Sequence, residues 1–159
     1  MKNYIQTIRS KLGHDLFIHP AARILVENEV GHFLTIIKVK TGQLGLPAGA
    51  LEFHETIEAC IKREVREETG LTLNSVQLIG LSSSPVNEKV HYPNGDQIQY
   101  FTTEFYSKDW SGTLQVQDLT EVKKAQFVPF ERLQEIPAIE QNILESWQHF
   151  QGTGQPLVR

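Results

Sequence analysis

The 159-residue chain has a single cysteine, Cys60, and no apolar run close to the ~18 residues that a membrane-crossing helix needs. One cysteine excludes an internal disulfide, and a reducing compartment is the simplest environment for such a chain. The first twenty residues also lack the apolar core of a signal peptide. These absences predict a cytoplasmic protein without a membrane span.

The chain also lacks an excess of basic residues, since its formal net charge is −4. Stable binding to nucleic acid needs a basic surface that neutralises phosphates, so we expect none. The hydrophobic share of 40% and the charged share of 21% are ordinary for a globular protein. A chain of this length is expected to fold as one domain, residues 1–159, with a substantial core.

Residues 49–71 read GALEFHETIEACIKREVREETGL and form the most informative stretch. Pro47 and Gly49 indicate a loop, and Thr56 is a good helix N-cap. No Gly or Pro interrupts the chain from Thr56 to Thr69, and Gly70 is suited to the left-handed position after a last helical turn. The pattern predicts a loop followed by a helix.

On that helix, Ile57, Cys60, Ile61, Glu64 and Glu68 share a sector of roughly 100°, and Glu67 lies at its edge. Cys60 is expected to pack beside Ile61, not to act as a nucleophile. Carboxylates on an apolar face repel each other, and a divalent cation would reverse that repulsion. Oxygen-only ligands favour Mg²⁺ or Mn²⁺ over Zn²⁺. The alternative is a solvated charged helix.

The same residues carry a resemblance to a known family. Their spacing fills every defined position of the Nudix box, GX5EX7REUXEEXGU with U a bulky aliphatic residue. The resemblance implies an α/β/α sandwich with a mixed β-sheet between helical layers. It also implies hydrolysis of a nucleoside diphosphate linked to another moiety, with water attacking one phosphorus of the pyrophosphate.

By position, the resemblance assigns metal binding to the box. Glu64 and Glu68 would be the principal Mg²⁺ ligands, with Mn²⁺ able to substitute. Glu67 would assist directly or through water, and the carbonyl of Gly49 is a possible backbone ligand. An alternative is a Nudix-fold module that binds a nucleotide without turning it over, but such a module has no need of an intact metal cluster.

The remaining catalytic roles are less closely specified. The resemblance pairs Arg63 with Glu55, which would brace the loop against the helix. The general base is either a box glutamate, with Glu64 and Glu67 among the expected catalytic residues, or an acid in a later loop. Glu121 is our candidate for that acid, and Asp118 and Glu104 are alternatives.

Two positions depart from the common family pattern. Ala48 stands where many members have Gly, which leans toward substrates of the ADP-sugar type. His54 stands where a glycine would allow a positive φ, a conformation that His tolerates better than most residues. The substrate is expected to be a small nucleotide, either a nucleoside triphosphate or an ADP-sugar. Tyr92, Tyr100 and Phe105 are candidates for stacking on its base.

The rest of the chain is compatible with this fold. A short N-terminal helix within residues 1–13 could pack on the body or on a second subunit, which would make a homodimer. We expect strands at 16–18, ending at Pro20, and at 76–81, 114–116 and 126–128, and hairpins that join 22–26 to 33–39 and 90–92 to 97–104. A one-turn helix follows Pro129, and a last helix starts at Pro137. The tail, 151–159, is expected to be loosely held.

Overall fold

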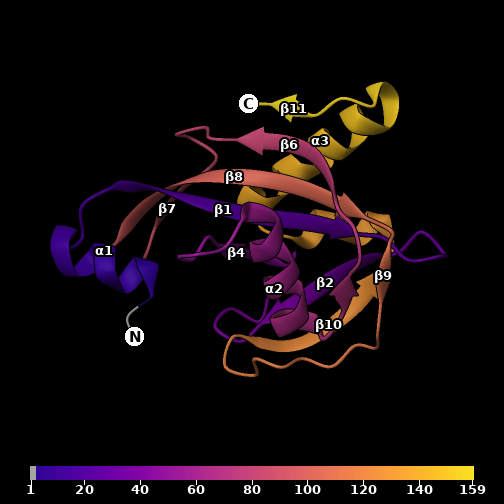
Figure 1. Cartoon of the computed structure of the whole chain (residues 1–159), viewed down its shortest axis with the longest axis horizontal. Helices are drawn as coiled ribbons and strands as arrows, with labels where there is room; N and C mark the ends of the chain where they lie inside the picture. The colour runs from indigo at the N-terminus through magenta and orange to yellow at the C-terminus, as the bar shows by residue number, and fades with distance from the viewer. Residues whose placement is uncertain (1–2) are drawn as a thin grey trace.

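The computed structural model describes residues 3–159, and Figure 1 shows helices on both sides of a twisted sheet. The elements, in chain order, are α1 (Tyr4–Leu12), β1 (Phe17–Val26), β2 (Phe33–Lys38), β3 (Leu44–Gly45), β4 (Ala48–Ala50), α2 (Ile57–Thr69), β5 (Thr72–Leu73), β6 (Gln77–Ser82), β7 (Lys89–His91), β8 (Gln97–Ser107), β9 (Trp110–Ser111), β10 (Val122–Val128), the 3-10 helix η1 (Phe130–Glu135), α3 (Ala138–Thr153) and β11 (Leu157–Val158).

The main sheet has the order β11-β6-β8-β1-β4, with β7 paired to β8, and it mixes parallel and antiparallel neighbours. Alternation along β1 supplies both faces of this sheet. Ala22 and Ile24 pack in one core cluster with Ile61 of α2, whereas Leu25 packs in another with Ile143 of α3. The predicted α/β/α sandwich with a mixed sheet is therefore confirmed.

The predicted hairpin between residues 22–26 and 33–39 is wrong. β1 pairs with β8 and β4, whereas β2 belongs to a second sheet of order β10-β2-β3, and a single isolated bridge, Glu27 to Phe33, joins the two ends. Each strand instead pairs along its length with a distant strand, β1 with β8 and β2 with β10. The short strand expected at 16–18 is likewise part of β1, which continues through Pro20. The carbonyl of Pro20 accepts from the amide of Leu51 at 3.0 Å, so the pairing does not need a proline N–H.

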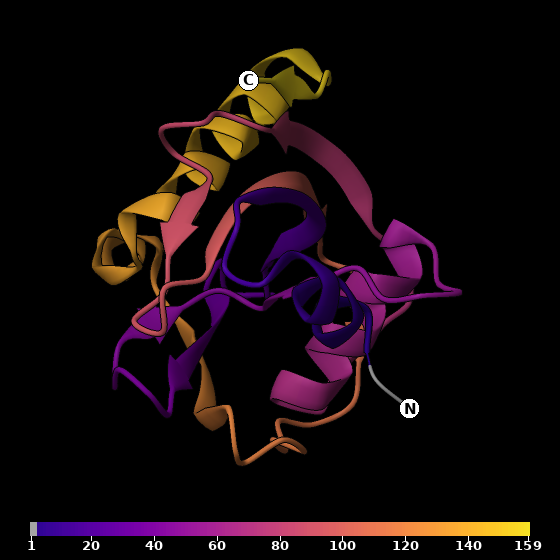
Figure 2. The same ribbon diagram turned by 90° about the vertical axis from the view of Figure 1, so that its left-hand side faces the viewer.

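The N-terminal helix forms as α1, although none of its residues is fully buried. Asn3 caps it by accepting from the amide of Gln6 at 2.8 Å. Near its other end, Arg9 donates to the carbonyl of Gln97 at 2.9 Å and lies 3.4 Å from Asp96, in the turn of the confirmed β7–β8 hairpin. Figure 2 shows α1 in front of the sheet, at the end of the molecule that faces the viewer.

The expectation of a loosely held tail, 151–159, is also wrong. α3 continues to Thr153, and β11 pairs in parallel with β6 at the edge of the main sheet. The guanidinium of Arg159 then donates to both carboxylate oxygens of Glu104 at 2.9 Å. A buried carboxylate thus holds the end of the chain in place. No helix within residues 3–159 is long and apolar enough to cross a membrane.

Candidate active site

The loop and helix of residues 49–71 have the ends that their sequence predicts. Thr56 caps α2 by accepting from the amide of Ala59 at 3.1 Å. Gly70 ends the helix with φ 82°, and its amide donates to the backbone carbonyl of Arg66 at 2.9 Å. A Cβ on Gly70 would also lie 2.4 Å from the carbonyl oxygen of Gln115. Glycine is therefore required at this position both for its φ and for a close backbone approach.

The segment packed against that glycine is not the strand predicted at 114–116. It is irregular, and its amides satisfy carbonyls that the end of α2 leaves free. The amide of Gln115 donates to Thr69 at 2.8 Å, and the amides of Gln117 and Asp118 donate to Glu67 at 3.0 Å. This docking brings the following loop, with Glu121, beside the helix.

Glu64 lies against the backbone of the loop. A Cβ on Gly49 would come within 2.0 Å of its carboxyl carbon, so only glycine leaves room for this side chain. Glu64 is 13% exposed, and burial raises the pKa of its carboxyl to about 7. Arg63 opposes that shift, whereas the charges of Glu67 and Glu121 add to it.

Glu68 is buried one turn further along, with 7% of its surface exposed. Its carboxylate accepts from the amide of Ala48 at 3.1 Å. Burial and the neighbouring charge of Glu64 raise the pKa of this carboxyl well above its usual value. Glu67, by contrast, is 45% exposed at the rim. Helix and loop therefore hold two poorly solvated carboxyl groups at one place, with a third beside them.

Arg63 pairs with Glu55, as the sequence predicts. Two donor bonds, from Nε at 3.0 Å and from Nη2 at 2.7 Å, reach the two carboxylate oxygens. The bonds from Arg63 lower the pKa of Glu55, which also accepts from the amide of Glu52 at 3.0 Å. Nη1 donates to Glu64 at 2.7 Å. One guanidinium thus ties the loop to the helix and orients Glu64.

Cys60 packs beneath this bracket, as expected. It is fully buried in the core cluster that also holds Ile61 and Val65. Burial, followed by the charge of Glu55, raises the pKa of the thiol to about 12. A thiol in this state is not a nucleophile at neutral pH.

The comparisons with known proteins agree with this geometry. The profile of the NUDIX domain matches residues 17–148, which is most of the chain. The chain belongs to the Nudix family. The ADP-ribose pyrophosphatase of Methanocaldococcus jannaschii is 38% identical over 74 residues, 44% of each chain. The NAD-capped RNA hydrolase NudC of Vibrio atlanticus is 46% identical over 41 residues, 26% of this chain and 15% of the relative.

The match therefore spans less than half the length of these two curated relatives. Among solved structures, a MutT protein of Bacillus halodurans superposes with a TM-score of 0.65 at 20% identity, over 88% of this chain and 86% of the other. That likeness supports the Nudix fold alone.

The carboxylates fit the hard cation that the Nudix box implies. Glu64 and Glu68 offer only oxygen, the charge of Glu64 raises the cost of ionising Glu68, and Gly49 lies against Glu64 at the adjoining strand β4. Within residues 3–159, however, no three such side chains already converge in a metal-binding arrangement. Arg63 bonds to Oε1 of Glu64 and not to Oε2, so Glu64 would have an oxygen to offer an ion while Arg63 stays in place.

The structure separates the candidates for the general base. Glu121 is exposed, and its charge raises the pKa of both Glu64 and Glu68, so it lies within reach of the site. Asp118 instead accepts from the hydroxyl of Thr120 at 2.5 Å and from its amide at 3.0 Å, and these two bonds shape the loop and lower the pKa of the carboxyl. Glu104 is a wrong alternative, because it is fully buried and bonds to Ser146 of α3, on the opposite side of the sheet from α2.

The three aromatic candidates have different positions. Phe105 is 5% exposed in the core under α2, so the prediction that it binds substrate is wrong. The hydroxyls of Tyr92 and Tyr100 lie 2.6 Å apart on the β7–β8 hairpin, and the ring of Tyr100 stacks on His19 at 6.2 Å. Any contact of these two tyrosines with substrate remains a prediction.

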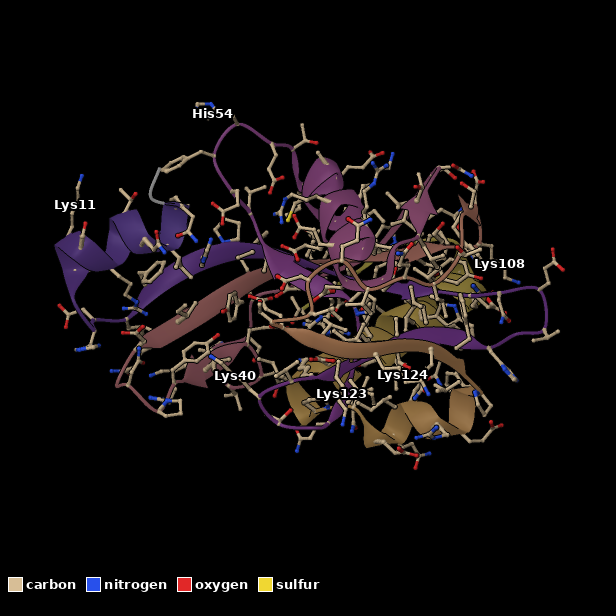
Figure 3. The ribbon with its side chains drawn as sticks, turned by 90° about the horizontal axis from the view of Figure 1, so that it is seen from below. Lys11, Lys40, His54, Lys108, Lys123 and Lys124 are labelled. Carbon is tan, nitrogen blue, oxygen red and sulfur yellow. The ribbon has the colours of Figure 1, made fainter. Side chains whose placement is uncertain are left out.

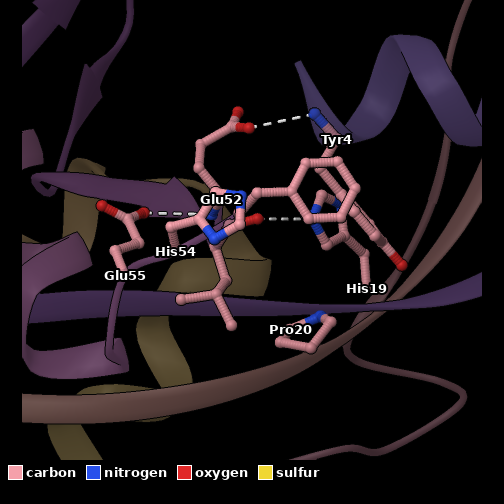
Figure 4. Close-up of a pocket in the computed structure, with 8 residues that line it drawn as sticks. Tyr4, His19, Pro20, Glu52, His54 and Glu55 are labelled. Carbon is pink, nitrogen blue, oxygen red and sulfur yellow. Dashed lines mark hydrogen bonds between the residues drawn. The ribbon is translucent and has the colours of Figure 1, made fainter. Parts of the chain in front are cut away.

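His54 adopts the positive φ expected for its position, at 66°. Figure 3 shows its side chain at the outer tip of the loop, directed away from the body, with Lys40, Lys123 and Lys124 on the other side of the molecule. The loop also borders a hollow of about 310 Å³ that the sequence did not reveal (Figure 4). Tyr4 and His19 reach it from α1 and β1, and no local pattern shows that they meet there.

Proposed function

We propose that this Nudix protein is a Mg²⁺-dependent hydrolase that cleaves the pyrophosphate bond of a nucleoside diphosphate linked to another moiety. The observation that carries the proposal is the pair of largely buried carboxyl groups, Glu64 and Glu68, whose pKa values are raised by desolvation and by neighbouring carboxylates. Two acids held together at such a cost are expected where a cation offsets it.

Glu64, Glu67, Glu68 and the carbonyl of Gly49 are the residues that would hold the ion. When bound, Mg²⁺ supplies charge neutralisation for the pyrophosphate and makes a water molecule more acidic. The chain itself must accept a proton from the attacking water. The box glutamates Glu64 and Glu67 are candidates for that role, and Glu121 at the rim is the alternative.

The positioning role belongs to Arg63. Its bonds to Glu55 and Glu64 fix the loop and the helix relative to each other, so that the acidic groups keep their separation when substrate charge arrives. The pair is charge-assisted and two-pronged, a geometry that lysine could not reproduce.

The printed names of two relatives, an ADP-ribose pyrophosphatase and an NAD-capped RNA hydrolase, support a substrate with two groups joined through a pyrophosphate. Nucleoside triphosphates are the other substrate class in the proposal. We also propose a cytoplasmic location, in keeping with a cysteine that is free and buried.

A panel of nucleoside diphosphate derivatives and triphosphates, assayed for release of mononucleotide, tests the proposed reaction. We expect turnover of at least one compound with Mg²⁺ or Mn²⁺ and none with EDTA. If nothing is hydrolysed and one compound raises the Tm without metal, the chain is a nucleotide-binding module and the proposal is wrong.

A further inference from the structure

The hollow beside the box loop has aromatic walls. Tyr4, from α1, lies edge-on to Phe53 with 5.1 Å between ring centroids, and 4.8 Å from the ring of His19. Phe53 is 52% exposed, so one face of its ring is free to stack. A volume of about 310 Å³ is at the small end for ligand sites and suits a single ring system.

The polar groups of the hollow are mainly acceptors. Glu52 has no lysine or arginine partner within residues 3–159, and its Oε2 accepts from the amide of Tyr4 at 3.0 Å. Glu55 is neutralised by Arg63. His19, the fully buried floor, contacts the carbonyl of Leu51 at 3.2 Å through Nε2, and its Nδ1 has no partner in the described structure.

That floor adds no positive charge at neutral pH, because burial lowers the pKa of His19. A neutral imidazole with Nε2–H donating to Leu51 leaves Nδ1 as an acceptor beneath the surface of the hollow, out of contact with a ligand. Figure 4 shows Glu52 extended toward the start of α1, above the rings of Tyr4 and His19. A ligand in this hollow would therefore meet the carboxylate of Glu52, which has no basic partner among the residues that the structure describes.

The hollow adjoins the proposed reaction site through Glu55, which lines it and bonds to Arg63, the residue that orients Glu64. The loop between them is held in an uncommon conformation, with His54 at φ 66°. Such a backbone is retained only where its surroundings impose it, and it often marks ligand contacts.

We infer that this hollow binds the base of the substrate and that Glu52 selects a ring edge with two adjacent N–H donors, as guanine has. The two carboxylate oxygens would accept from N1–H and from the 2-amino group while the ring stacks on Phe53. Adenine presents one donor beside a bare nitrogen acceptor, which the carboxylate repels. Only the identification of the ligand as the substrate's base rests on the proposed function.

Nucleoside binding tests this inference without any hydrolysis. Guanosine, inosine and adenosine form a matched series, since inosine lacks only the 2-amino group of guanosine. We expect the metal-free protein to bind them in that order, with NMR shifts centred on Tyr4 and residues 51–54. Losing one hydrogen bond to a charged group should weaken binding by about tenfold.

Glu52→Gln is the decisive variant. Its amide oxygen can still accept from the amide of Tyr4, so α1 stays in place, but its second position becomes a donor. Affinity for guanosine should fall about tenfold or more, and adenosine should bind as well as guanosine or better, because an amide matches an adenine edge. Glu58→Gln, which changes an exposed carboxylate paired with Lys62 outside the hollow, is the control and should leave all three affinities unchanged.

Equal affinities for the three nucleosides, or an unchanged order in Glu52→Gln, would overturn the inference. Neither result bears on the hydrolysis assay, which depends on Glu64 and Glu68. Conversely, a protein that hydrolyses nothing yet prefers guanosine through Glu52 would retain the base site and lose the proposed reaction.

Discussion

At the scale of single residues, Glu64 combines two demands. It would have to be ionised to bind the proposed cation, yet it is 13% exposed and its pKa is raised to about 7 by burial. Arg63 and the Gly49 backbone hold it in that environment. The folded protein therefore disfavours the ionised form of Glu64 even before substrate binds. Carboxyl groups on the open surface carry no such penalty, and strongly shifted pKa values are typical of functional sites.

Glu64→Gln is expected to lower kcat by at least about a hundredfold, because the amide can neither bind Mg²⁺ as an anion nor accept the proton. The shape of the side chain is kept, so at or below pH 4.5, where Glu64 is protonated in the folded wild type, the free energy of unfolding should change by less than about 1 kcal/mol. Steady-state kinetics and urea unfolding measure the two effects. Activity within tenfold of wild type would remove Glu64 from the site.

The same residue predicts a pH dependence of stability. A carboxyl group whose pKa is raised on folding, here from 4.5 to about 7, binds its proton more tightly in the folded state. This tighter proton binding contributes fully to the free energy of unfolding below pH 4.5, and the contribution is lost as the pH rises to about 7. The total loss is about 3 kcal/mol. Metal-free protein should therefore become less stable from pH 5 to pH 7.5 through this group.

His19 acts in the opposite direction, since its lowered pKa removes stability as the pH falls below 6.5. The difference between wild type and Glu64→Gln, measured by urea unfolding at each pH, isolates the carboxyl group. We expect this difference to shift in favour of the variant as the pH rises. A difference independent of pH would contradict the raised pKa.

Residue positions on α2 could be predicted from the sequence, because helical periodicity alone brings Glu64 and Glu68 to one face. Glu104 and Phe105 could not. Strand alternation places them on opposite faces of β8, but both faces are covered, one by α3 and the other by α2. Only the packing of distant elements decides that neither side chain reaches the site.

At the scale of elements, the end of α2 fixes the loop that carries Glu121. Gly70→Ala combines a left-handed φ with a Cβ 2.4 Å from the Gln115 carbonyl, so both the helix end and the segment 115–118 must shift. We expect a loss of about 2–4 kcal/mol in the free energy of unfolding. Gly154→Ala is the matched control, since Gly154 ends α3 with φ 69° and has no atom within 4 Å of the added Cβ.

Gly154→Ala should lower the free energy of unfolding by about 1 kcal/mol, because alanine is strained at a left-handed φ even where no atom clashes with its Cβ. Equal losses in the two variants, measured by urea unfolding, would show that the contact with Gln115 is unimportant. Here the sequence predicted the glycine cap but not its partner, because a cap is local and the 115–118 segment is far along the chain. The wrong β1–β2 hairpin has the same cause: a loop of suitable length cannot reveal that each strand pairs with a strand far along the chain, β8 or β10.

At the scale of the whole molecule, one buried carboxylate links the middle of the sheet to the chain end. Glu104 of β8 is fully buried, lies 3.3 Å from Arg23 of β1 and accepts from Arg159 after β11. Gly80 of β6 leaves room for it, since a Cβ there would lie 2.5 Å from its Oε2. Removing a partner from a buried charge is costly, because the remaining charge stays desolvated.

Deleting residues 155–159 should therefore lower the free energy of unfolding by about 3–5 kcal/mol, measured by urea unfolding. Arg159→Met alone should reproduce most of this loss, and adding Glu104→Gln should recover part of it, since the unpaired charge is then gone. Arg132→Met is the control: Arg132 pairs with Glu135 at 2.9 Å, like Arg159 with Glu104, but on the exposed surface, so no measurable change is expected. A truncated protein as stable as the full chain would mean that Arg23 suffices for Glu104, and that β11 only covers the edge of the sheet.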